Sequence, residues 1–295
     1  HFVRKDGIFE VVFKNGQSRG ICMLSKIEEI SHVKSSLKNI SFDTWVFLDL
    51  DNTVMESVLD LGGDQWFSYL MRNAASDSSA EPIIKLYYAV QAHIRSQAVE
   101  PEIVLMINAL QAIGVPVFAL TARGPSILQA TVRQLSEIGI DFSKNKLRLS
   151  SDLQYDSGII CCDGKNKGHA LSRFLEGCTQ RPRHLIMLDD KHPHLLHVQD
   201  AAQRFNIDFS GFRYAFLDEK VSQFDITKAN LQLAHIKERL PADAQDAIDS
   251  LQLLPESLVV ADNYHHFKHG FFGSEQTMSS GSEANVTRIS RSMSI

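Results

Sequence analysis

The chain has 295 residues, of which 44% are hydrophobic and 22% charged, so it can bury a sizeable core as an ordinary globular protein. This length allows one large domain or a core domain with an insertion. A net charge of −5 argues against a nucleic-acid partner and against global attraction to an anionic membrane, and no apolar run reaches the length of a transmembrane helix.

The first 40 residues are expected to form a peripheral addition to the core. Asn15-Gly16 lies between two apolar runs, which is a strong hairpin signal. Residues 25–38 have the pattern of a short amphipathic helix. The chain begins at His1 and not at Met, so we leave open a processed leader, a tag or a truncation ahead of it, a signal peptide included.

A continuous apolar run from Thr44 to Leu48 leads into two carboxylates, Asp49 and Asp51, and then into the hydroxyl of Thr53. Such a run suits a strand that is buried on both faces of a parallel sheet. The carboxyl ends of these strands are where α/β proteins usually build their sites. We therefore expect a site around Asp49.

Residues 54–98 lack strong strand patterns and are predicted to form a helical insertion over the carboxyl edge of the sheet. One helix is expected from Asp64 and another over Ile83–Ala98, joined by a polar loop. A third helix, over 101–113, has Pro at its first position and is followed by Gly114, an asymmetry typical of helix ends.

Strands and helices alternate through the rest of the core, which we place at 41–227. This alternation predicts an α/β fold with a Rossmann-like three-layer parallel sheet. The expected later strands are 115–120, 158–162, 184–188 and 213–217, and the expected helices between and after them are 126–138, 165–176 and 193–204.

The chain after the core is expected to form a C-terminal helical extension over 228–272 and a flexible tail over 273–295. The tail is rich in Ser, Gly and Thr and has too few apolar groups to fold by itself. The aromatic residues between 264 and 272 fit a helix that packs on the core, which we favour, or contact with a membrane, a phosphoinositide or a partner.

The cysteines predict buried free thiols in a reducing compartment, and therefore a cytoplasmic protein. Two of the four are adjacent, which makes a poor disulfide framework, and no Cys-x-x-Cys pair with metal-binding spacing occurs. They are Cys22, Cys161, Cys162 and Cys178.

Polar residues follow the ends of successive predicted strands. Singly, each fits a helix cap or a solvated charge. Their order along the chain predicts one shared site, because parallel strands bring their carboxyl ends to one edge. They are Asp49, Asp51 and Thr53, then Thr121 and Arg123, then Lys165 or Lys167, and last Asp189 and Asp190.

In this motif set the chain resembles the haloacid-dehalogenase-like (HAD) phosphatase superfamily. The resemblance covers residues 44–217 and rests on Asp-x-Asp-x-Thr at 49–53, a strand followed by Thr121, a lysine before a helix, and a strand followed by Asp-Asp. It implies a HAD-like core with a helical cap, and a Mg²⁺-dependent phosphomonoester hydrolase acting on a phosphorylated small molecule or phosphoprotein.

The resemblance also implies a role for each motif residue. Asp49 would be the nucleophile that forms an aspartyl-phosphate, Asp51 the general acid and base, Thr121 a phosphate contact and Lys167 the neutralising cation. The implied metal residues are Asp49, Asp51 (through its carbonyl), Asp189 and Asp190. The implied substrate-binding residues are Asn52, Thr53, Arg123 and Lys165. We prefer Lys167 over Lys165 as the phosphate lysine, because Lys-Gly-x-x-Leu at a helix start is the usual context in the family.

One departure concerns position 194, which is His where many members carry a further acid or Asn. A third metal contact from this motif is therefore expected to be absent or replaced by water. The His-rich runs at 192–197 and 265–269 could suggest a second metal, but we interpret them as surface or capping residues, because no Cys or acid accompanies them at fixed spacing.

Several alternatives were weighed against the phosphatase. Asp51 argues against a dehalogenase, Leu50 against a P-type ATPase, and the late position of the acid pair against a receiver domain. A phosphomutase stays open, as does a partner- or membrane-binding, effector-like protein in which the core is secondary. The N-terminal addition and the insertion resemble those of uncharacterised HAD-like proteins of intracellular bacterial pathogens, which raises phosphotyrosine substrates and action in a host cytosol.

Overall fold

The computed structural model describes residues 2–5, 8–11, 21–37, 40–74, 80–145 and 155–254. The predicted Asn15-Gly16 turn, the aromatic segment 264–272 and the predicted tail lie outside these residues. Within them, no helix has both the length and the apolar character that crossing a membrane requires.

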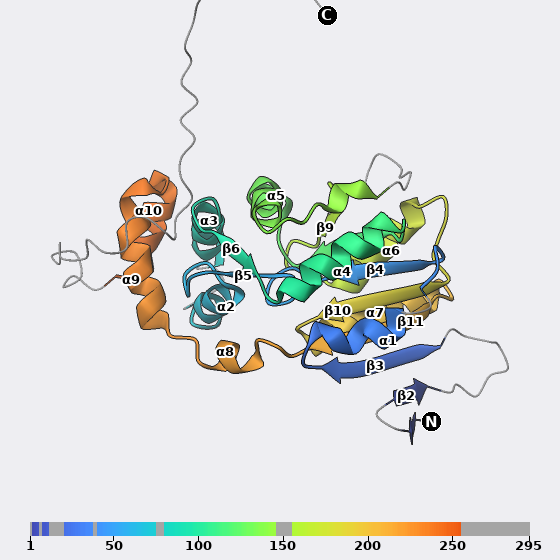
Figure 1. Ribbon diagram of the computed structural model, residues 1–295. Helices are drawn as coiled ribbons and strands as arrows, with labels where there is room; N and C mark the ends of the chain where they lie inside the picture. The colour runs from blue at the N-terminus through green and yellow to red at the C-terminus, as the bar shows by residue number, and fades with distance from the viewer. Residues whose placement is uncertain are drawn as a thin grey trace, which may run out of the picture.

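The core is a seven-stranded sheet with the strand order β3-β11-β10-β4-β7-β9-β8 (Figure 1). All neighbours pair in parallel except β8 with β9. The fold is therefore the predicted α/β, Rossmann-like layered fold. The strands are β3 (Cys22–Ile27), β4 (Thr44–Leu48), β7 (Val117–Thr121), β8 (Tyr155–Asp156), β9 (Ile159–Cys161), β10 (His184–Asp189) and β11 (Asp208–Tyr214).

The central strand β4 is buried along its whole length, as its continuous apolar run predicts. Its alternate side chains enter two different cores, with Val46 and Leu48 on one face of the sheet and Trp45 and Phe47 on the other. Phe47 stacks on Phe118 of β7 at 5.1 Å between ring centroids. Burial on both faces fixes the register of β4, and thereby the place where Asp49 leaves the sheet.

Helices cover both faces of the sheet. One face packs against the 3₁₀ helix η1 (Ile30–Val33), α4 (Pro101–Ala112) and α5 (Leu128–Glu137), and the other against α6 (Lys167–Gly177) and α7 (His192–Arg204). Pro101 opens α4, and Gly114, with φ of +84°, follows its end, as predicted. These layers leave the carboxyl ends of β4, β7, β9 and β10 facing the same edge.

The N-terminal region differs from the expected peripheral addition. β3 pairs in parallel with β11 and forms the edge of the central sheet, so residues 22–27 belong to the core. The expected helix over 25–38 is replaced by the end of β3, η1 and a short α1 (Lys34–Leu37). The hairpin that the structure describes pairs β1 (Phe2–Lys5) with β2 (Ile8–Val11), ahead of the predicted one.

The predicted insertion is present, but it is not wholly helical. It contains α2 (Asp64–Arg72) and α3 (Ala80–Gln91), and the expected second helix ends early because residues 96–98 form a strand. That strand, β6 (Ser96–Ala98), pairs antiparallel with β5 (Met55–Ser57) and makes a two-stranded stem at the base of the insertion.

The C-terminal helices are part of the same cap and do not form a separate extension. α9 (Ile226–Ile236) and α10 (Ala242–Ser250) lie beside α2 and α3 at the end of the sheet where the strands stop, and α8 (Asp218–Ser222) connects them to the core (Figure 1). Trp66, Leu86 and Leu233 are fully buried in one hydrophobic cluster that both pairs of helices share. We refer to α2, α3, α9 and α10 together as the composite cap.

The last core strand begins earlier than its sequence suggests. The apolar run at 213–217 predicts a strand there, but β11 spans Asp208–Tyr214 and Phe216 is 43% exposed beyond its end. The alternation in β11 is obscured by Ser210 and Gly211, where the Cβ of any larger residue at 211 would lie 2.5 Å from the side chain of Leu24. Close packing against β3 therefore accounts for a weak strand signal.

Candidate active site

The turn after β4 presents the two carboxylates of the Asp-x-Asp motif. The backbone N–H of Asp49 donates to the carbonyl of Leu188, which ties the end of β4 to β10. The chain then folds back tightly, and the N–H groups of Val54 and Met55 both donate to the carbonyl of Leu50. Asn52 occupies the left-handed region with φ of 60°, a conformation that Asn tolerates better than most residues.

Lys167 connects the first and last acidic motifs. Its Nζ lies 2.6 Å from Asp49 Oδ1 and 2.7 Å from Asp189 Oδ2, and its side chain is fully buried. The side chain of Asn166 caps the start of α6 by accepting from the N–H of His169, and this cap fixes Lys167 as the first residue of the helix. By contrast, the Lys165 side chain is 77% exposed and lies 3.7 Å from Asp163.

His194 completes the acidic cluster, which the sequence interpretation did not anticipate. Its Nδ1 lies 3.0 and 3.2 Å from the two carboxylate oxygens of Asp189. Asp49, Asp189 and His194 each offer a ligand atom, and these atoms all lie within 4.8 Å of one another. The interpretation of His194 as a surface or capping residue is therefore wrong. The available signal was its position in the first turn of the helix that follows β10.

Asp190 lies next to this cluster. Its backbone N–H donates to the hydroxyl of Thr53 at 3.1 Å, which joins the first and last motifs by a second link. Its Oδ1 is buried and has no hydrogen-bond partner among the described residues. Burial, together with the nearby charges of Asp49 and Asp189, raises the pKa of Asp190 well above its ordinary value.

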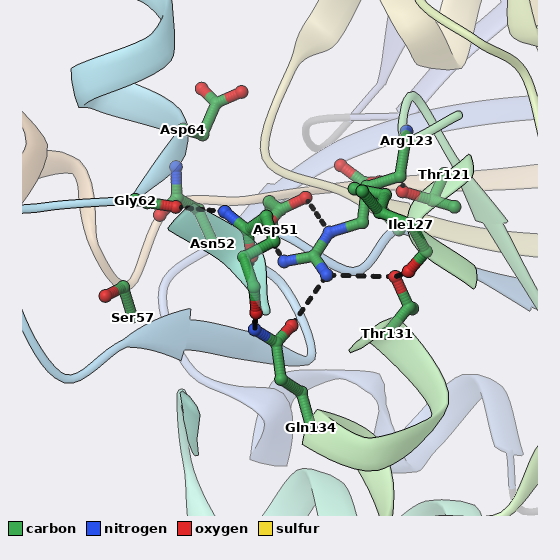
Figure 2. A network of polar contacts seen from close by, with 12 residues as sticks. Asp51, Asn52, Ser57, Gly62, Asp64, Thr121, Arg123, Ile127, Thr131 and Gln134 are labelled. Carbon is green, nitrogen blue, oxygen red and sulfur yellow. Dashed lines mark hydrogen bonds and ion pairs between the residues drawn. The ribbon is translucent and has the colours of Figure 1, made fainter. Parts of the chain in front are cut away.

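Asp51 forms a bidentate ion pair with Arg123. The guanidinium Nε and Nη2 donate to the two carboxylate oxygens at 2.9 and 2.8 Å (Figure 2). Both side chains are largely buried, with 19% of Asp51 and 4% of Arg123 exposed. The expected role of Arg123 as a direct substrate contact does not match this geometry, because the side chain is occupied by Asp51 and by Thr131 and Gln134.

The remaining predicted substrate residues line the same edge. The Thr121 side chain is fully buried and its Oγ1 accepts from the N–H of Arg123 at 3.2 Å. The amide of Asn52 accepts from Gln65 of the cap at 3.3 Å. Gly124 comes directly after Arg123 in the loop that follows β7. A Cβ at position 124 would lie 2.3 Å from the hydroxyl of Tyr88, so the backbone needs glycine there.

The electrostatics divide the carboxylates into two pairs. Burial and the charge of Asp189 raise the pKa of Asp49 to about 6, although Lys167 opposes the shift. Burial also acts to raise the pKa of Asp51 and of Asp189, but Arg123 outweighs it for Asp51, and Lys167 with His194 outweighs it for Asp189, so both pKa values are lowered. Asp49 and Asp190 are thus the acids with raised pKa values.

The composite cap contacts the core on two sides of the site. Lys191 Nζ, which follows the acid pair, donates to both carboxylate oxygens of Asp64 at 2.9 and 2.8 Å. The hydroxyl of Tyr88 donates to Asp163 at 3.4 Å. Asp64 begins α2 and Tyr88 belongs to α3, so each insertion helix has a polar contact with a different loop of the core.

Similar proteins and one family model place the chain among its relatives. A Chlamydia pneumoniae protein named "Putative outer membrane protein" is 25% identical over 215 residues, covering 70% of this chain and 82% of that protein. A Chlamydia trachomatis protein of the same name is 24% identical over 196 residues, covering 64% and 75%. The sequence model of DUF2608, described as a protein of unknown function, matches residues 26–245, which include every site residue above and most of the composite cap. The chain therefore belongs to the DUF2608 family.

Proposed function

We propose that the chain is a phosphomonoester hydrolase of the HAD type, which acts through an aspartyl-phosphate on Asp49. One observation carries the proposal. Lys167 lies fully buried between Asp49 and Asp189, at the carboxyl edge of a parallel sheet, with a second carboxylate two residues beyond the first. A carboxylate that attacks a phosphate dianion needs such a cation, because the two reactants repel each other.

The reaction follows from the positions of these groups. An oxygen of Asp49 attacks phosphorus, the ester oxygen leaves, and Asp51 supplies the proton that the leaving alkoxide takes up. The bound phosphate dianion favours this proton on Asp51, because its charge opposes the lowering of the Asp51 pKa by Arg123. Asp51, then ionised, removes a proton from water, which attacks phosphorus and releases inorganic phosphate and free Asp49. The buried hydroxyl of Thr121 stands at the end of β7, where it can donate to a phosphate oxygen.

A divalent cation fits the donor set. Asp49 and Asp189 share the positive charge of Lys167, which leaves negative charge uncompensated, and the Oδ1 of the neighbouring Asp190 has no partner among the described residues. Mg²⁺ bound at Asp49, Asp189 and the carbonyl of Asp51 would supply further charge neutralisation on the phosphate. His194 adds a nitrogen donor, which transition metals accept more readily than Mg²⁺ does, so Mn²⁺ is the informative comparison.

Hydrolysis of p-nitrophenyl phosphate tests the proposal. We expect turnover by the wild-type chain with Mg²⁺ or Mn²⁺, none by Asp49→Asn, and a loss of about 10²–10⁴ in kcat for Asp51→Asn. Mass spectrometry of acid-quenched wild type should show one added phosphoryl group, which Asp49→Asn lacks. Equal turnover by wild type and Asp49→Asn, with both variants folded by circular dichroism, would refute the mechanism.

The location of the chain is a separate proposal. None of the four cysteines forms a disulfide, and this supports a reducing compartment. The printed names of the Chlamydia relatives instead refer to an outer membrane. We retain the cytoplasm as the proposed location, with a host cytosol as the alternative. Cell fractionation, with the chain detected by an antibody, distinguishes the two cytosolic locations from a membrane location.

A further inference from the structure

A continuous path of hydrogen bonds, partly exposed at Asp51 and buried beyond Arg123, leads from Asp51 into the composite cap (Figure 2). It starts at the bidentate contact of Arg123 with Asp51 and continues through Gln134 of α5 and Gln91 of α3. It ends at the carbonyl of Gly62, in the loop just before α2. The path therefore crosses from the core to the cap.

The core end of the path fixes the guanidinium of Arg123. Its Nη1 donates to Thr131 Oγ1 at 3.0 Å and to Gln134 Oε1 at 2.7 Å, and both acceptors lie on α5. Thr131 in turn donates to the carbonyl of Ile127 at 2.9 Å. Since the other side of the guanidinium holds both oxygens of Asp51, the rotamer of Asp51 depends on where α5 holds Arg123.

Two fully buried amides carry the path from the core to the cap, Gln134 on α5 and Gln91 on α3. Gln134 Nε2 donates to the carbonyl and to the side-chain oxygen of Gln91, at 3.3 and 3.1 Å. Gln91 Nε2 donates to the carbonyl of Gly62 at 2.7 Å. Gly62 has φ of +74°, and a Cβ there would lie 2.3 Å from the Ile94 side chain, so this position favours glycine. Each amide thus accepts at one end and donates at the other.

We infer that Gln134 and Gln91 are positioning residues, which make the placement of the Asp51 carboxylate depend on the placement of the cap. The inference rests on the proposed function, in which Asp51 gives its proton to the leaving group. When the cap is seated, Gln91 holds Gln134, Gln134 holds Arg123, and Arg123 holds Asp51. When α3 moves away from α5, Gln91 no longer orients Gln134. The contact of Gln134 with Arg123, and that of Arg123 with Asp51, then lose this support.

A purely structural role would give a different result. Removing a buried amide that only stabilises the fold lowers the free energy of unfolding and affects all substrates alike. Removing one that positions a general acid affects mainly the esters whose leaving groups need a proton. Hydrolysis of the aspartyl-phosphate, in which Asp51 acts as the base, is common to all esters, whereas kcat/KM reports only the steps up to departure of the leaving group. The dependence of kcat/KM on the leaving group is therefore the readout that separates the two roles.

The experiment uses Gln134→Met and Gln91→Met in the full chain, with p-nitrophenyl phosphate and an alkyl phosphate as substrates. We expect kcat/KM for the alkyl ester to fall by about 10-fold or more in either variant and kcat/KM for the p-nitrophenyl ester by less than about 3-fold. The double variant should lose little beyond either single variant, since the residues act in one path. Gln111→Met is the control for a glutamine outside the path, because Gln111 donates to the carbonyl of Asp141 of another segment in a more exposed place.

Equal losses for both esters, or the same pattern in Gln111→Met, would overturn the inference while leaving the phosphatase in place. A second readout does not need activity. The Nε–H signal of Arg123 in ¹⁵N NMR, assigned by its absence in Arg123→Lys, should shift and exchange faster with water in Gln134→Met and Gln91→Met but not in Gln111→Met. If the wild type hydrolyses neither ester, the proposed function fails. Separately, an Arg123 Nε–H signal that is unchanged in Gln134→Met and Gln91→Met would show that the path does not position Arg123.

Discussion

Replacing Lys167 by Met tests the central feature of the site, because it removes the cation between two buried carboxylates and nearly keeps the volume. The Nζ lies 2.6 and 2.7 Å from Asp49 and Asp189, and both the lysine and Asp189 are fully buried. Breaking a buried pair by removing one partner costs about 3–5 kcal/mol, since the other charge stays buried without compensation. A protein of this size loses about 2–4 °C in Tm for each kcal/mol, so we expect a fall of about 6–20 °C.

The loss should depend on pH, and its sign follows from the carboxylates. Without Lys167 the pKa of Asp49, already raised to about 6 by burial and Asp189, rises further above the value in the unfolded chain. At a pH between the pKa of Asp49 in the unfolded chain and its higher pKa in the folded variant, the folded state binds more protons than the unfolded state. The free energy of unfolding of the variant therefore falls as pH rises. The deficit relative to wild type should therefore be smaller at about pH 5 than at about pH 8.

Thermal or urea unfolding at both pH values, without added metal, measures the effect. Lys165→Met is the matched control, since its side chain is 77% exposed and its loss should stay within about 0.5 kcal/mol. Added Mg²⁺ should recover part of the stability, by about 2.7 kcal/mol at a concentration of 100 times the Kd. Indistinguishable unfolding of Lys167→Met and Lys165→Met would refute the arrangement of charges described here.

Two further substitutions test the acidic cluster and the composite cap. Asp190→Asn should raise the metal-free stability at neutral pH by about 1–3 kcal/mol, because the burial that raises the pKa of Asp190 opposes folding and a neutral amide avoids this cost, and a lower Tm than wild type would contradict this. Leu233→Ala should cost about 2–5 kcal/mol, since Leu233 is fully buried against the insertion helices. On the same helix Leu231 is 38% exposed, so Leu231→Ala should cost much less in urea unfolding, and equal losses would mean that α9 does not pack against α2 and α3.

The sheet and its acidic strand ends could be predicted because their physical signal is local. Asp49 and Asp189 each follow an unbroken apolar run, and such a run has few alternatives to a doubly buried strand. Edge strand β3 gave no such signal, because Cys-Met-Leu-Ser-Lys-Ile is only partly buried and also fits a helical period. Its place was decided by pairing with β11, a contact far along the chain.

The side chains of the site were predictable only in part. Lys165 and Lys167 stand two residues apart before the same helix, and only the structure shows that one is exposed and the other fully buried. The contact of His194 with Asp189 could be predicted only from the position of α7 relative to Asp189. The buried amides of Gln91 and Gln134 lie 43 residues apart, and no periodicity marks a glutamine whose partner is on another element.

The composite cap bears on how a substrate would reach Asp49. Asp49 is only 5% exposed, so access requires the cap and the core to separate at the site. Among the polar contacts between cap and core, those of Lys191 with Asp64 and of Tyr88 with Asp163 are partly exposed, and an ion pair such as the first is worth about 0–1 kcal/mol. The apolar cluster that joins α2 and α3 to α9 and α10 is far more costly to break. We therefore expect all four helices to move together as one body on the β5–β6 stem and the α8 connection, and the amides of Gln134 and Gln91 to separate in that movement.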